Sequence, residues 1–296
     1  MKLLNSYKNG NCDVSIFENG TKIRKFDSDP NPIWPESMDV KITDWCELGC
    51  PWCHEKSTTK GQHGDFEIAR RIFNDLPRGV ELALGGGNPL VWPNLMEFLK
   101  LMSTNGIICN MTVNNRHVKK HRDVIGDVLD KGFIKGLGIS YNKSSFEHSL
   151  EFTENNHVIY HVIMGINTLD DVKLICDSVK NPKILLLGYK QYGRGESFYS
   201  KEVEQNLKTW YCGLHEFFNR ESLTLSFDNL AIKQLNLKRF FSDETWNTFF
   251  MGDDGRFSMY LDLVKREYAK SSTSLVRHPL NKENTIAEIF GKIKSI

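Results

Sequence analysis

The chain has 296 residues, of which 40% are hydrophobic and 25% are charged, values ordinary for a globular protein with a sizeable core. Its formal net charge of +1 argues against a globally basic nucleic-acid-binding protein. No run of about eighteen apolar residues is present and the first residues form no apolar signal core, so neither a membrane span nor a secretory signal is expected. The seven cysteines are an odd number, which fits a disulfide framework poorly and favours a reducing cytoplasm.

The first part of the chain is predicted to be a β-hairpin followed by a linker. Two alternating runs, 12–18 and 21–26, flank Asn19 and Gly20, and an Asn-Gly pair strongly favours a two-residue turn. Residues 28–37 then contain three prolines, which is typical of a linker.

From residue 38 onward, short apolar segments alternate with amphipathic helical patterns. The expected strands are 38–43, 80–84, 107–113, 136–140, 157–164 and 183–188. The expected helices are 66–76, 93–105, 116–131, 145–155, 168–179 and 200–218. This alternation predicts an α/β fold whose parallel sheet has right-handed crossovers, and six such units predict a partial (β/α)6 TIM-like barrel. In such folds, the loops that follow the strands build the functional site.

The remainder of the chain departs from this alternation. A strand-like segment, 223–227, precedes a helical pattern at 229–239, and residues 251–262 have the pattern of a turn that enters a strand. That strand is expected to form a hairpin with 265–270. The predicted parts are an N-terminal hairpin and linker (1–37), a partial barrel (38–220) and a C-terminal α+β extension that caps the barrel (221–296).

The most informative motif is a group of three cysteines, Cys46, Cys50 and Cys53, directly after the first strand of the predicted barrel. Clustered thiolates suit soft metals and iron–sulfur clusters. A cubane cluster normally takes four cysteines, so three leave one iron open, and an open metal position is where substrate chemistry can occur.

Two other interpretations of this motif are considered. The spacing i, i+4, i+7 would place the three cysteines on one face of a core helix, but Gly49 and Pro51 disfavour that helix. A structural zinc site with His54 as the fourth ligand is also consistent with the residue types. Structural zinc ligands usually come as two separated pairs, however, and here they are contiguous.

The motif C-x3-C-x2-C after the first strand, with an aromatic residue before the third cysteine, resembles the radical S-adenosylmethionine (radical SAM) superfamily. The resemblance covers residues 38–220. It implies that Cys46, Cys50 and Cys53 hold a [4Fe–4S] cluster whose open iron is chelated by S-adenosylmethionine, and that Trp52 lies beside the adenine. It also implies reductive cleavage of S-adenosylmethionine to a 5′-deoxyadenosyl radical, which abstracts hydrogen from a substrate.

The second predicted strand ends in Gly85, Gly86, Gly87 and Asn88. Consecutive glycines let the backbone approach a ligand closely, although an ordinary turn has the same composition. In the family, a Gly-Gly-Glu-Pro-like motif at this place receives the methionine amino group. The present chain has an extra glycine and an asparagine instead of the acid, and the Asn88 amide oxygen and backbone carbonyls are suitable acceptors.

Later strands supply further candidates for cofactor contacts. Ser140 and Asn142 follow the fourth strand, where the family often places a polar residue against the ribose or carboxylate, and a helix N-cap is the alternative for Asn142. Lys190 and Arg194 follow the sixth strand and are expected to neutralise the carboxylate of the cofactor or of an anionic substrate. A solvated surface loop is the alternative for these two cations.

The resemblance therefore predicts a radical SAM enzyme that depends on a flavodoxin or ferredoxin-type electron donor. No side chain is assigned as a catalytic acid or base. A peptide side chain is the favoured substrate, because the C-terminal hairpin is similar to those of peptide maturases, but no cysteine follows Cys212 to hold an auxiliary cluster. Nucleotide- or nucleoside-modifying chemistry is the alternative within the superfamily. A non-enzymatic zinc or nucleic-acid-binding module is the alternative outside it.

Overall fold

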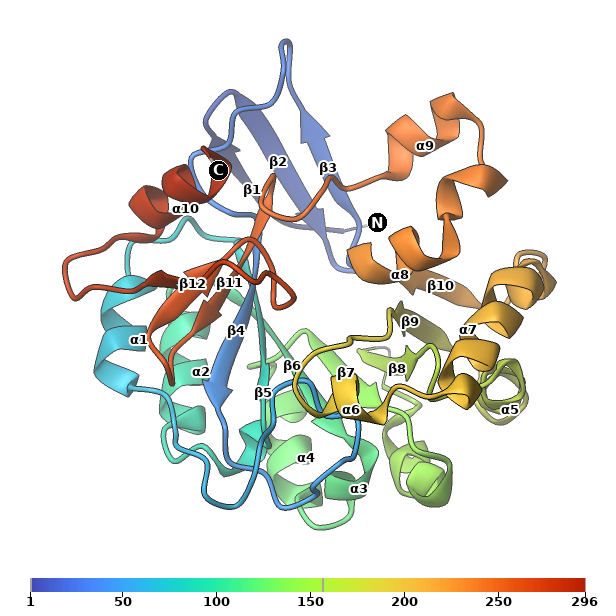
Figure 1. The fold of residues 1–296 in the computed structure, drawn as a ribbon. Coiled ribbons are helices and arrows are strands. Elements are labelled where there is room, and N and C mark those ends of the chain that lie inside the picture. The colour runs from blue at the N-terminus through green and yellow to red at the C-terminus, as the bar shows by residue number, and fades with distance from the viewer. Residues whose placement is uncertain (1, 156, 296) are drawn as a thin grey trace.

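The computed structural model describes residues 2–155 and 157–295, and its centre is a curved, mostly parallel β-sheet (Figure 1). Six consecutive parallel strands form the middle of this sheet in chain order: β4 (Ser37–Thr43), β5 (Glu81–Gly86), β6 (Ile108–Asn114), β7 (Gly136–Ser140), β8 (Val158–Ile163) and β9 (Lys183–Leu187). Each overlaps the segment predicted from the sequence. The predicted α/β fold with a partial barrel is therefore confirmed.

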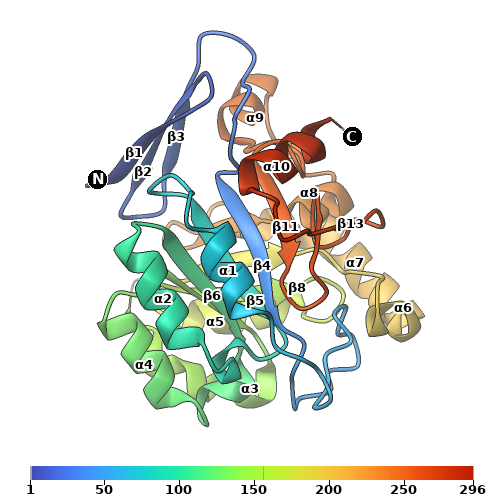
Figure 2. The same ribbon diagram turned by 90° about the vertical axis from the view of Figure 1, so that its left-hand side faces the viewer.

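Helices connect these strands and lie on the outer side of the curved sheet (Figures 1 and 2). The α-helices are α1 (Phe66–Ile72), α2 (Leu95–Thr104), α3 (Asn115–Val118), α4 (Arg122–Asp130), α5 (Leu169–Ser178), α6 (Arg194–Phe198) and α7 (Lys201–Gly213). The 3₁₀ helices are η1 (Pro89–Val91), η2 (Lys143–Phe152) and η3 (Leu214–Phe217).

Three of these helical segments differ from the prediction. The helix expected at 116–131 is divided into α3 and α4, and α6 forms in a segment expected to be a loop. The helix expected at 145–155 is the 3₁₀ helix η2, in which the hydroxyl of Ser149 donates to the carbonyl of Phe146 at 2.7 Å. Serine side chains compete in this way with regular α-helical bonding.

The parallel strands have an apolar outer face and a more polar inner face. On β8, Tyr160 and Val162 are buried in the core, whereas His161 faces a cavity of about 790 Å³ on the inner side of the sheet. On β7, Leu137 is likewise in the core and Gly138 lines the cavity. Because side chains alternate along a strand, this pattern packs the helices on one face and leaves a polar lumen on the other.

The last third of the chain extends this sheet on both sides. β10 (Thr224–Phe227) is parallel to β9, and β11 (Ser258–Asp262) is parallel to β4. β12 (Glu267–Ala269) is antiparallel to β11, as the predicted hairpin requires, and β13 (His278–Pro279) follows it. Since strands from residues 224–279 join strands of the predicted barrel, the three-part division of the chain stays a prediction.

Helices of the C-terminal region surround these added strands. They are α8 (Asn229–Leu235), the 3₁₀ helix η4 (Leu237–Phe240), α9 (Asp243–Phe249) and α10 (Ile286–Lys294). The first two correspond to the predicted helical pattern, whereas α9 and α10 were not predicted. Within the described parts of the chain, no helix is both long enough and apolar enough to cross a membrane.

A separate antiparallel sheet lies at the end of the barrel where the parallel strands begin (Figures 1 and 2). It consists of β1 (Leu3–Asn9), β2 (Cys12–Phe17) and β3 (Lys22–Lys25). The predicted hairpin is thus confirmed as β2–β3, and β1 is an additional strand. The β2–β3 turn, with Gly20 at φ +86°, lines the lumen together with the first residues of several parallel strands, so the small sheet forms a floor.

One buried asparagine holds this floor sheet to the linker that follows it. Asn9 is fully buried, and its side-chain oxygen accepts from the backbone N–H groups of Ile33 and Trp34, each at 2.9 Å. Its side-chain nitrogen donates to the carbonyl of Trp34 at 2.8 Å. All three hydrogen bonds of this buried side chain are directed at two residues of the linker.

We therefore predict that Asn9→Ala lowers the free energy of unfolding by about 3 kcal/mol, because three hydrogen bonds made by a buried side chain are lost and two backbone N–H groups and a carbonyl lose their partner. Urea unfolding followed by tryptophan fluorescence measures this. Asn11→Ala is the matched control, since the Asn11 side chain is also hydrogen-bonded, to Ser28, Asp29 and Asn31 among others, but is exposed. The control should lose less than about 1 kcal/mol, and equal losses would contradict the role assigned to burial.

Candidate functional site

A buried lysine at the end of β4 fixes the loop that carries the three cysteines. The ammonium of Lys41 lies 2.5 Å from a carboxylate oxygen of Asp44 and 2.7 Å from one of Glu55, at the two ends of the cysteine segment. It also lies 3.2 Å from a carboxylate oxygen of Asp262 on β11. Burial alone would lower the pKa of Lys41, but Glu55 and Asp262 raise it above the usual range. Lys41 is therefore a charged anchor for the loop.

Arg194, on α6, holds the same loop from the other side. Its Nε donates to the carbonyl of Cys50 at 2.9 Å, and both terminal nitrogens donate to the carbonyl of Ser57 at 3.2 Å. Arg194 is not among the residues that line the lumen. The guanidinium of Arg194 is thus bonded to backbone carbonyls of the cysteine loop, and its role in neutralising a cofactor carboxylate stays a prediction.

Cys46, Cys50 and Cys53 all line the lumen and are partly buried free thiols. Burial raises the pKa of Cys46 and of Cys50, and the neighbouring cysteines contribute to both shifts. The other four cysteines of the chain do not line this cavity. Three partly buried thiols around one cavity are a suitable donor set for an iron–sulfur cluster with one open iron.

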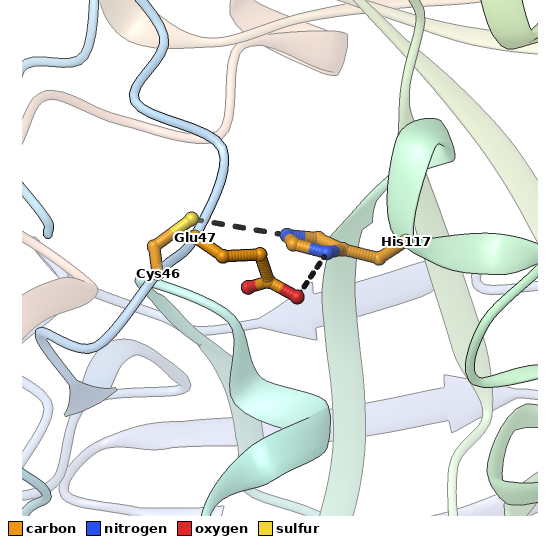
Figure 3. Close-up of side chains that lie close together, drawn as sticks. All are labelled: Cys46, Glu47 and His117. Carbon is orange, nitrogen blue, oxygen red and sulfur yellow. Dashed lines mark hydrogen bonds and ion pairs between the residues drawn. The ribbon is translucent and has the colours of Figure 1, made fainter. Parts of the chain in front are cut away.

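A histidine and a glutamate that sequence reasoning missed lie beside the first cysteine (Figure 3). His117 Nε2 is 3.8 Å from the Sγ of Cys46, and its Nδ1 is 3.5 Å from a carboxylate oxygen of Glu47. Burial lowers the pKa of His117 to about 4, although Glu47 opposes this shift. The donor atoms of these residues lie within 4.8 Å of one another, so a single metal ion is a competing occupant of Cys46.

Three glycines, the last two residues of β5 and the one that follows it, line the lumen beside the start of the cysteine loop. Gly86 has φ +113°, and a side chain on Gly87 would place its Cβ only 2.1 Å from the carbonyl oxygen of Trp45. The backbone N–H of Gly87 donates to the carbonyl of Thr43 at 2.7 Å. Only glycine permits this approach, and the glycine backbone is thereby presented to the cavity as predicted.

Asn88 is fully buried and does not line the lumen, unlike the prediction. Its side-chain oxygen accepts from the backbone N–H of Leu90 at 3.2 Å and starts the 3₁₀ helix η1. Its side-chain nitrogen lies 3.3 Å from His117 Nδ1 and 3.4 Å from His121 Nε2. The local turn thus directs the Asn88 amide toward His117 and His121, and its contact with the amino group of a ligand stays a prediction.

The two polar candidates near the end of β7 have different environments in the structure. Ser140 lines the lumen, as predicted. Asn142 does not, and its side-chain oxygen instead accepts from the backbone N–H of Ser144 at 3.2 Å as the N-cap of η2. The capping alternative therefore describes Asn142, and its predicted contact with a ribose or carboxylate is corrected.

Trp52 and Lys190 both line the lumen, where they were expected. The ring of Trp52 lies 5.6 Å from that of Phe198 on α6, which supports its position beside the cysteines. The ammonium of Lys190 lies 3.3 Å from His54 Nε2 and 2.9 Å from the hydroxyl of Ser272. Lys190 is thus held in place at the wall of the cavity rather than on a solvated surface loop.

Two titratable side chains within the lumen also escaped sequence reasoning. The carboxylate of Asp39 on β4 has no hydrogen bond or ion pair with any described residue, and burial raises its pKa while Lys190 opposes the shift. His161 on β8 likewise has no side-chain hydrogen bond to the described part of the chain, and burial lowers its pKa to about 4. The sequence feature that could have indicated these two residues is the alternation of polar with apolar residues along their strands.

Comparison with known proteins identifies a matching family and solved structures with a similar fold. The sequence matches the Radical SAM superfamily over residues 40–183. No curated protein matches the chain.

Three similar structures are of SuiB from Streptococcus suis. The structure of SuiB bound to S-adenosylmethionine has 11% identity and a TM-score of 0.62, and the match covers 89% of this chain and 68% of SuiB. SuiB bound to the precursor peptide SuiA has 13% identity and a TM-score of 0.62, with 90% and 68% covered. SuiB alone has 12% identity and a TM-score of 0.59, with 90% and 69% covered. At sequence identities this low, the structural similarity shows a shared fold and no more.

The position of Arg194 leads to a prediction about the order of the cysteine loop. We expect Arg194→Ala to increase hydrogen-exchange rates of the amides in 46–58 by roughly tenfold, because three hydrogen bonds to the loop are lost. Hydrogen–deuterium exchange of the cluster-free protein measures this. The control is Arg70→Ala, which removes an exposed ion pair with Glu67 on α1. Unchanged exchange in 46–58 would contradict the clamping role of Arg194.

The contact between Gly138 and His161 leads to a second prediction. A Cβ added at Gly138 would lie 2.4 Å from Cε1 of His161, so Gly138→Ala should destabilise the protein by about 1–3 kcal/mol. Adding His161→Ala should restore most of that loss. The control is Gly126→Ala in α4, where no atom lies within 4 Å of the new Cβ and a small stabilisation is expected. Thermal unfolding of these three variants and of the wild type measures these effects, and a tolerated Gly138→Ala would refute the contact.

Proposed function

Since the chain belongs to the radical SAM superfamily, whose enzymes work with a [4Fe–4S] cluster and S-adenosylmethionine, we propose that Cys46, Cys50 and Cys53 hold this cluster. We further propose that the enzyme uses the resulting radical to abstract hydrogen from a peptide side chain. When bound, the cluster supplies the electron that cleaves the sulfonium of S-adenosylmethionine. The observation that carries the proposal is the set of three free thiols around one cavity, on a loop anchored by Lys41 and Arg194.

The residues proposed to bind S-adenosylmethionine surround the thiols within the same lumen. The backbone carbonyls of Gly85, Gly86 and Gly87 are suited to accept from its ammonium group, because no side chain intervenes. Trp52 offers an aromatic face to the adenine, and Ser140 a hydroxyl to the ribose or carboxylate.

Lys190 is proposed to neutralise the carboxylate of the cofactor or of the substrate. Its ammonium is held at the lumen wall by Ser272 and His54, so binding an anion there requires little reordering of the side chain. The neighbouring Asp39 and His161 extend the polar lining toward the floor of the lumen, where a substrate group would lie. The floor sheet and the cysteine loop limit access of water at the two ends.

A peptide is the favoured substrate, with two observations in support. The cavity of about 790 Å³ is in the upper part of the range of sites that take drug-sized ligands. SuiB, whose fold is similar, has been solved with a precursor peptide. A nucleotide or nucleoside substrate is the alternative. An electron donor of the flavodoxin or ferredoxin type is required in either case, and the free state of all seven cysteines suits the reducing cytoplasm.

Replacing any one of Cys46, Cys50 and Cys53 by alanine should abolish cluster binding and cleavage of S-adenosylmethionine. Protein purified without oxygen and reconstituted with iron and sulfide should be brown. Iron and sulfide are then measured per chain, together with methionine and 5′-deoxyadenosine after reduction. Cys212→Ala is the control, because Cys212 is exposed and remote from the lumen, and it should behave as the wild type. A colourless protein with one zinc per chain would refute the proposal in favour of a zinc module.

A further inference from the structure

The imidazole of His117 stands between a proposed cluster ligand and a fixed polar network (Figure 3). His117 is 2% exposed, and its Nε2 is directed at the Sγ of Cys46, 3.8 Å away. Its Nδ1 faces Glu47 at 3.5 Å and Asn88 at 3.3 Å. Glu47 is in turn paired with Lys120 at 3.3 Å. The ring is therefore held on both sides, and its orientation toward the sulfur is set by residues from separate parts of the chain.

Asn88 can only present its amino group to His117. Its oxygen is engaged by the backbone N–H of Leu90, which fixes the direction of the amide. The Nδ2 of Asn88 is therefore a donor toward Nδ1 of His117, and Nδ1 then acts as the acceptor. In a neutral imidazole with Nδ1 as the acceptor, Nε2 carries the proton.

The alternative, in which Nδ1 donates to Glu47, fits the facing sulfur less well. A neutral ring would then present a bare Nε2 lone pair to Cys46. A cysteine bound to iron is a thiolate, which carries no proton and can only accept, so this lone pair and the sulfur would repel each other. The arrangement with Nδ1 as the acceptor is therefore the one that suits a ligated Cys46, and in it Nε2–H points at the sulfur.

We propose that His117 donates a hydrogen bond from Nε2 to the sulfur of Cys46 and thereby raises the reduction potential of the cluster. The proposal rests on the assignment of Cys46 as a cluster ligand. A donor at a ligand sulfur stabilises the reduced cluster, which has one more negative charge than the oxidised one. One electron enters from the donor protein, and His117 keeps its proton throughout. His117 is a positioning residue that acts through Cys46.

The first test is a potentiometric titration of the reconstituted enzyme, with the reduced cluster quantified by electron paramagnetic resonance. His117→Phe retains a ring but has no donor, and the reduced-to-oxidised ratio at a fixed potential should fall roughly tenfold, which equals about 59 mV for a one-electron couple. His117→Gln retains an N–H group and should restore most of the shift. His121→Phe is the control, because His121 touches Asn88 but not Cys46. An unchanged potential in His117→Phe, or an equal shift in the control, would overturn the proposal.

A second measurement needs no variant. It distinguishes a failure of the proposed hydrogen bond from a failure of the proposed cluster. Wild-type protein labelled with ¹⁵N-histidine is reduced, and its electron–nuclear double resonance spectrum is recorded. A weak coupling to one histidine nitrogen, together with an exchangeable proton, is expected. Absence of coupling in a protein that has its full iron and sulfide refutes the hydrogen bond but leaves the cluster assignment intact. A strong coupling would show direct ligation by histidine and also refute the proposal. Absence of iron and sulfide would refute the proposed function itself.

Discussion

The arrangement of the site depends on one buried positive charge. Lys41 is 2% exposed, and an ammonium in such a position is stable only when carboxylates compensate it. Asp44 and Glu55 do so from the two ends of the cysteine segment, and Asp262 does so from the C-terminal strand β11. The cysteine loop and the C-terminal region are thereby linked through the ammonium group of Lys41. This coupling explains why the strand next to β4 comes from so far along the chain.

The second constraint is the division of each strand into an outer apolar and an inner polar face. The outer residues pack against helices, and the inner ones, such as Asp39 and His161, leave a cavity because several positions between them are glycine. Gly138 is an example, since any side chain there would occupy the place of the His161 ring. A polar lumen of this kind does not stabilise the fold, so its maintenance is consistent with the binding of ligands.

The sequence predicted those features that local rules determine. The β2–β3 hairpin follows from Asn19 and Gly20, and the six parallel strands follow from their apolar periodicity. What it could not predict depends on which segments meet in space. Arg194 was expected to bind a ligand because its loop position and charge suited that role, but its partners are backbone carbonyls contributed by a segment about 140 residues away. Because every residue has a backbone carbonyl, the sequence does not indicate which carbonyls will accept such hydrogen bonds.

Asn88 illustrates how such a hidden contact accounts for a departure from a family pattern. The amide nitrogen of Asn88 lies 3.4 Å from a carboxylate oxygen of Glu47, in a position without access to solvent. An acid at position 88 would place two carboxylates at this distance, where like charges repel strongly and little water is available to screen them. An amide of the same shape as aspartate instead donates to Glu47 and to His117. The asparagine is therefore suited to the polar network behind Cys46, and the glycine backbone alone is left to face the lumen.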